Sequence, residues 1–69
     1  MQSHSDVINA FGGVRPLAEA IGISPSRAIH WARRGIPAKY WPLVEEAAAG
    51  KEIGVTARDL RRLPPQMGA

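Results

Sequence analysis

Apolar residues recur at helical spacing along the chain, and no stretch alternates apolar and polar residues as a strand would. The first such group is Val7 and Ile8, which lie four and three residues before Phe11 and so share one helix face. We expect this helix to begin with Ser5 as its N-cap, after a disordered tail of residues 1–4. The pair of glycines that follows Phe11 ends it.

A pair of short helices joined by a tight turn is predicted next. Pro16 suits the first turn of the second helix, which stops at Gly22. Ser24 and Pro25 then begin a third helix that runs to about Arg34, because a serine caps the first amides and a proline fits the first helical position. Glycine supplies the positive φ that the turn needs. The arrangement is that of a helix-turn-helix, whose second helix enters the DNA major groove.

The predicted third helix has two different faces. At about 100° per residue, Ala28, Trp31 and Ala32 share one side and are expected to pack inward. The opposite side and its edge are hydrogen-bonding and cationic, and carry Ser26, Arg27, His30, Arg33 and Arg34. Ile29 lies at the other edge of this polar face. One face of the helix therefore packs, and the other can meet a polyanion.

The remainder of the chain predicts three further elements. A short helical turn is expected at residues 37–40, followed by a helix over residues 41–49 that the next glycine closes. Thr56 caps a last short helix, with Asp59 at the position of a capping box. Residues 64–69 are expected to be disordered. The expected fold is therefore a single all-α domain, residues 1–69, of four to five short helices.

Two aromatic residues admit two interpretations. Tyr40 and Trp41 cover the core in the interpretation that we favour, or form a dimer surface with Leu43 and Val44. A second basic group near the C-terminal end is interpreted as a solvated helix face. It consists of Arg58, Arg61 and Arg62.

The distribution of charge favours a nucleic-acid partner. The net charge of the chain is only +3, but residues 15–39 hold five basic side chains and one acidic one, Glu19. The chain has no cysteine, which fits a reducing cytoplasm and excludes disulfides and thiolate metal sites. No signal peptide or apolar run long enough to span a bilayer is recognised. With no catalytic or metal-binding spacing either, we expect no enzyme, metal, cofactor or small-molecule substrate.

The polar face of the third helix supplies the candidate DNA contacts. Arg27 and His30 are the best candidates for base edges, Ser26 suits a base or a phosphate, and Ile29 either touches a thymine methyl group or packs beside the second helix. Basic residues at the start of the second helix, and late in or after the third helix, suit the phosphates of the DNA backbone instead. These phosphate candidates are Arg15, Arg33, Arg34 and Lys39.

The segment SDVINAFGGVRPLAEAIGISPSRAIHWARRGIP resembles the all-helical Cro repressors of lambdoid phages and the related YdaS-like regulators. The similarity covers roughly residues 5–50. It is carried by four features, which are DVI-x-x-FG at 6–12, LA-x-A-I-GIS at 17–24, Trp31, and Ile36-Pro37.

The resemblance implies a lambda-repressor-like helix-turn-helix domain that represses transcription by binding double-stranded DNA as a homodimer. It also implies that residues 25, 26, 29 and 30 touch base edges, which adds Pro25 to the candidates. The chain departs from the family at Ala28, where valine or isoleucine is usual, and at Pro25, where a polar residue is common. The competing hypothesis is a protein-interaction module, such as a toxin partner or a phage assembly component, that keeps the fold without binding DNA.

Overall fold

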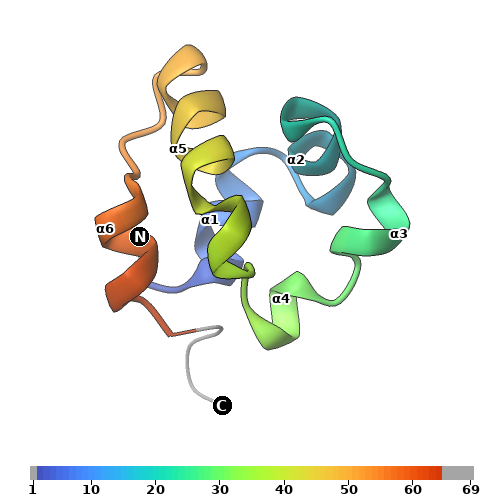
Figure 1. The fold of residues 1–69 in the computed structure, drawn as a ribbon, viewed down its shortest axis with the longest axis horizontal. Coiled ribbons are helices and arrows are strands. Elements are labelled where there is room, and N and C mark those ends of the chain that lie inside the picture. The colour runs from blue at the N-terminus through green and yellow to red at the C-terminus, as the bar shows by residue number, and fades with distance from the viewer. Residues whose placement is uncertain (1, 65–69) are drawn as a thin grey trace.

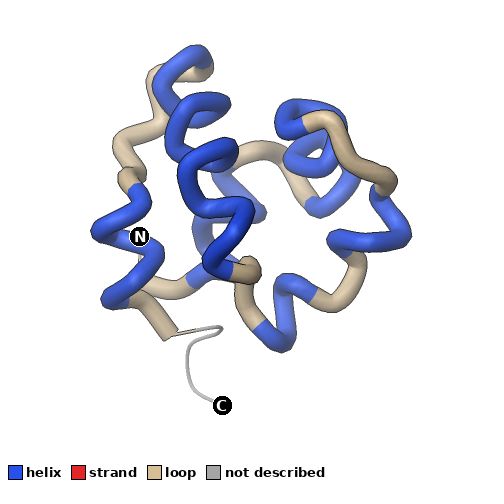
Figure 2. The backbone as a smooth tube through the Cα atoms, in the orientation of Figure 1, coloured by secondary structure: helices blue, strands red, loops and turns tan. Residues whose placement is uncertain are grey.

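Helices account for all the regular structure in residues 2–64, which are the residues that the computed structural model describes, and no strand occurs among them (Figures 1 and 2). The elements are α1 (His4–Ala10), α2 (Val14–Ile21), α3 (Pro25–Ala28), α4 (Trp31–Arg34), the 3-10 turn η1 (Ala38–Tyr40), α5 (Trp41–Gly50) and α6 (Ala57–Arg62). The five predicted helices are all present, and the third is divided into α3 and α4. The all-α prediction is therefore confirmed.

Glycine in the left-handed conformation ends α2 and sets up the turn toward α3. Gly22 has a φ of +79°, and the amide of Ile23 donates to the carbonyl of Ala18 at 3.0 Å. This is the Schellman arrangement, in which a reversal of the backbone satisfies the last helical carbonyls. The predicted stop at Gly22 is confirmed.

Helix α5 ends in the same arrangement but without glycine at the critical position. The amide of Ile53 donates to the carbonyl of Ala48 at 2.8 Å, and Glu52 takes the left-handed conformation with a φ of +59°. The helix was predicted to end at residue 49 with Gly50 closing it, but Gly50 is the last helical residue and the reversal lies two residues later. A side chain at Glu52 costs about 1–2 kcal/mol relative to right-handed backbone.

The helices enclose one core to which every α-helix contributes. Its buried apolar residues are Val7, Ile8, Phe11, Leu17, Ala18, Ala28, Trp31, Ile36, Val44, Ala48, Val55 and Leu60. The residues predicted to face inward from the first helix are among them, as are Ala28 and Trp31 of the third, whereas Ala32 is only partly buried. Ala18 and Ala28 are fully buried, as expected for small residues at the points where helices approach closely.

The predicted third helix is interrupted at Ile29 and His30. His30 has φ −94° and ψ −2°, outside the range of a regular α-helix, and a new helix begins at Trp31. The two halves have different partners, since α3 packs against α2 and α4 packs against α1. A straight helix over these residues could pack against α2 or against α1, but not against both. The interruption therefore arises from tertiary packing, and the prediction of a continuous helix over residues 25–34 was wrong.

The N-terminal segment is structured from Ser3 onward, so the prediction of a disordered tail was wrong for Ser3 and His4. Ser3 is the N-cap of α1, where its hydroxyl accepts a hydrogen bond from the amide of Asp6 at 3.2 Å. The expected cap, Ser5, lies inside the helix. Ser3 is only 1% exposed and His4 only 5% exposed.

The imidazole of His4 holds three distant segments together. The amide of Ile36 donates to Nδ1 at 2.7 Å, so Nδ1 is the unprotonated nitrogen and Nε2 carries the hydrogen. Nε2 therefore donates to the carbonyl of Leu60, at 2.7 Å. That carbonyl lacks a helical donor, because the residue four positions later is Pro64. The backbone amide of His4 completes the junction by donating to the carbonyl of Pro64 at 2.9 Å.

Tyr40 and Trp41 belong to the core side of the molecule. Both are half-buried against the core, and the Trp41 indole donates to the carbonyl of Ile36 at 2.7 Å. The Tyr40 ring lies 5.0 Å from that of Trp31, measured between centroids. The core interpretation is therefore confirmed.

Helix α6 begins as predicted. Thr56 and Asp59 form a reciprocal capping box, in which each side chain accepts a hydrogen bond from the other residue's amide. Of the predicted C-terminal tail, Pro64 is ordered through its contact with His4, and residues 65–69 lie outside the described part of the chain.

The left-handed backbone at Glu52 predicts that Glu52→Gly stabilises the protein. We expect a gain of about 0.5–1 kcal/mol in the free energy of unfolding, because relief of strain exceeds the extra chain entropy of glycine. Urea denaturation measures it. Lys51→Gly, at the neighbouring position with φ −107°, is the matched control and should not stabilise. Equal effects of the two substitutions would contradict the assignment of strain to residue 52.

The bridging role of His4 predicts a large loss of stability for His4→Ala. The substitution leaves the Ile36 amide and the Leu60 carbonyl buried without partners, at about 1–3 kcal/mol each. His4→Asn keeps an acceptor near Nδ1 and His4→Gln a donor near Nε2, so each should cost less than alanine. The control is His30→Ala, which removes the exposed histidine and should change the free energy by less than about 0.5 kcal/mol. Similar stabilities of His4→Ala and His30→Ala in thermal denaturation would refute the role.

Candidate nucleic-acid interface

A helix-turn-helix is formed by α2, the turn at residues 22–24, and α3. Ser24 is the N-cap of α3 and accepts from the amide of Ser26 at 3.3 Å, while their two hydroxyl oxygens lie 2.8 Å apart. Pro25 occupies the first helical position with its side chain half-buried. The local sequence SPS therefore fixes where α3 begins and how it leaves the turn.

Four of the five residues predicted to contact bases lie at the surface, and the fifth, Pro25, is half-buried. Ser26, Arg27, Ile29 and His30 are all exposed. Ile29 is 61% exposed, so it does not pack beside α2, and that alternative is wrong. A largely exposed isoleucine next to arginine and histidine places an apolar group and hydrogen-bond donors on the same surface.

The predicted phosphate contacts lie on α2, on α4 and in η1. Arg15 is exposed in the first turn of α2, and Arg33 and Arg34 are exposed at the end of α4. Lys39 is exposed in η1, where its ammonium group lies 5.2 Å from the centroid of the Tyr40 ring. This distance supports a cation–π contact with Tyr40, and a contact of Lys39 with a DNA phosphate stays a prediction.

The basic group on α6 is separate from this surface. Arg58, Arg61 and Arg62 are exposed, as the sequence predicted. In Figure 1, α6 lies on the opposite side of the molecule from α3. The structure therefore does not combine the two basic groups into one surface.

The interruption of the third helix creates a hollow that the sequence analysis did not anticipate. It is lined by Ser5 of α1 together with Ile29, His30, Ala32 and Arg33. The sequence offered no signal for the contribution of Ser5, because it lies more than twenty positions before the other residues. Packing of α4 on α1 brings it there.

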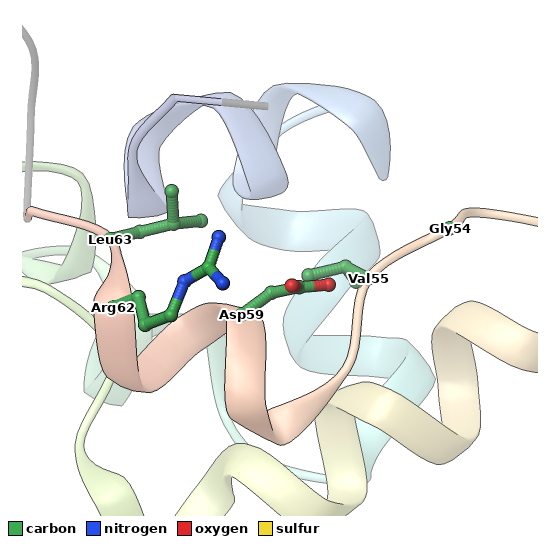
Figure 3. Close-up of a pocket in the computed structure, with 5 residues that line it drawn as sticks. All are labelled: Gly54, Val55, Asp59, Arg62 and Leu63. Atoms are coloured by element: carbon green, nitrogen blue, oxygen red, sulfur yellow. The ribbon is translucent and has the colours of Figure 1, made fainter.

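A second hollow at α6 has no comparable set of free polar groups. It is lined by Gly54, Val55, Asp59, Arg62 and Leu63, and the Arg62 guanidinium extends over it between Leu63 and Asp59 (Figure 3). The Asp59 carboxylate already accepts the Thr56 amide at 3.1 Å.

Within residues 2–64, no cluster of three or more His, Cys, Asp or Glu side chains is arranged to hold a metal ion. In the same segment, no helix has both the length and the apolar character needed to cross a membrane.

The fold and the surface together define a small all-helical domain built around a helix-turn-helix with an exposed cationic third segment. A family model described as "Bacterial toxin YdaS" matches residues 5–63, so the chain belongs to this family. The expected resemblance to YdaS-like proteins is thereby confirmed. No curated protein and no solved structure matches the chain.

Proposed function

We propose that the protein is a sequence-specific DNA-binding transcriptional regulator, in the manner of a Cro-like repressor, that inserts α3 into the major groove of double-stranded DNA. The observation that carries the proposal is the exposure of Ser26 and Arg27 on α3, whose opposite face is buried through Ala28, and of Ile29 directly after it. Exposed donors beside an apolar group can meet base edges and a thymine methyl group.

The roles of the individual residues follow from their positions. Arg27 lies in α3 itself and is assigned to a base edge, with guanine as its preferred partner. Arg15, Arg34 and Lys39 lie at the margins and are assigned to the phosphate backbone, which sets orientation without reading sequence. No catalytic step, cofactor or metal is part of this function.

A homodimer on DNA is part of the proposal. Helix α3 has only four residues, so one copy presents few side chains to the groove. Two copies on half-sites roughly 34 Å apart would double that contact. Repression would follow if the bound dimer excluded polymerase from its promoter, and the protein would act in the cytoplasm where the DNA is accessible.

The test of the proposal is titration of labelled duplex DNA at several salt concentrations. We expect binding whose affinity falls steeply as salt rises, with a log–log slope of about −0.9 for each phosphate neutralised. Selection from a random duplex pool then supplies the preferred site and its symmetry. A folded protein that binds no duplex even at low salt would refute the proposal.

The position of Arg27 predicts that Arg27→Ala weakens binding to the selected site by about 1–3 kcal/mol and relaxes preference at one base position. Competition between selected and unrelated duplexes measures both effects. Arg58→Ala, on the distant α6, is the matched control, with unchanged preference expected. Equal weakening of Arg27→Ala on all sequences would instead assign Arg27 to a phosphate.

The family description supports a second candidate, in which the chain acts as a toxin or with a protein partner. Leu43 of α5 is 42% exposed and gives such a partner an apolar contact away from α3. Growth arrest on expression that persists in Arg27→Ala and disappears in Leu43→Asp would favour this candidate over DNA binding.

A further inference from the structure

We propose that Ser5, His30 and Arg33 form a binding site for one backbone phosphate of the bound duplex, in the hollow beside α3. The proposal rests on the proposed DNA-binding function. It adds a contact from α1. It also moves His30 from the base edges to the DNA backbone, and Ile29 from a thymine methyl group to the sugars beside the phosphate.

The hollow exists because the chain bends between α3 and α4. Helix α3 packs against α2, whereas α4 turns away to pack against α1, and the space between the bend and α1 is left open. Its volume of about 470 Å³ exceeds the space of a single ion and falls in the range of small-molecule sites, about 300–1,000 Å³. A phosphodiester with its flanking sugars is a ligand of that size.

The lining matches a phosphodiester chemically. Ser5 brings a hydroxyl group, His30 an imidazole and Arg33 a guanidinium, and no acidic side chain lines the hollow. Within residues 2–64, the side chains of these three residues make no hydrogen bond to the rest of the chain. All three can therefore donate to phosphate oxygens, and charge-assisted bonds of this kind are the stronger ones.

The two apolar lining residues fit the same ligand. Ile29 and Ala32 lie on the wall of the hollow, where they can contact the deoxyribose groups on either side of the phosphate. The site is placed next to α3, where the backbone flanking the major groove would run once α3 is inserted.

The location of His30 separates it from the residues that read bases. Helix α3 ends at Ala28, and His30 lies in the bend, where it lines the hollow. A contact to phosphate carries no sequence information. His30→Ala should therefore weaken binding by the same factor on every duplex, in contrast to Arg27→Ala.

The experiment is a scan of the selected duplex with single methylphosphonate substitutions, each of which removes the charge of one phosphate. Wild type, Ser5→Ala, Arg33→Gln and Arg34→Gln are compared, after thermal denaturation has shown that each is folded. Arg34→Gln is the matched control, because Arg34 is the adjacent exposed arginine and does not line the hollow.

The proposal expects one backbone position where methylphosphonate weakens wild-type binding by roughly tenfold or more. At that position, methylphosphonate should weaken the binding of Ser5→Ala and of Arg33→Gln by less than about twofold, because each variant has already lost its contact with that phosphate. The binding of Arg34→Gln should weaken by the same factor as that of the wild type. Equal penalties in all four proteins, or a changed ratio of selected to unrelated duplex affinity in His30→Ala, would overturn the phosphate site and leave DNA binding intact. Failure of the wild type to bind any duplex would overturn both proposals.

Discussion

The structure depends on the imidazole of His4, which joins the start of α1, the segment that follows α4, and the end of α6. Two features of the chain make the junction necessary. Pro64 cannot donate to the Leu60 carbonyl, and the Ile36 amide is buried where the chain leaves α4. Both groups would be costly without partners. One neutral imidazole satisfies them together, and the Trp41 indole then satisfies the Ile36 carbonyl. These contacts fasten α1 and α6 over the core, which within residues 2–64 contains twelve buried apolar residues.

This junction also determines the shape of the candidate interface. With Ile36 held by His4, α4 must lie along α1, whereas α3 must lie along α2 to complete the helix-turn-helix. The bend at Ile29 and His30 allows α3 to pack on α2 and α4 to pack on α1. It exposes Ile29, shortens the helix available for base contacts, and opens the hollow lined by Ser5 and Arg33. A feature of core packing is therefore directly responsible for the surface that we propose for DNA.

Most of the fold could be predicted from local chemistry. Capping by neighbouring residues sets the helix starts at Ser24-Pro25 and at Thr56. The left-handed backbone of a single glycine sets the helix stop at Gly22. The inward positions follow from helical spacing. Two errors are of another kind, since His4 was assigned to a tail and residues 25–34 to one helix. The cap of α1 and the reversal after α5 were misplaced by two residues each, and both of those errors are local. His4 has no local signal, because its partners are 32 and 56 positions away.

The sequence by itself determined most helix positions, the caps at Ser24 and Thr56, and the concentration of basic residues over positions 15–39, because each depends on residues within a few positions of one another. It also determined which face of α3 is polar. Only the tertiary structure decided that His4 is buried, that the third helix divides, and that Ser5 meets His30 and Arg33. These outcomes depend on which helices compete for the same core, and on which buried amides and carbonyls remain without partners after the helices have packed.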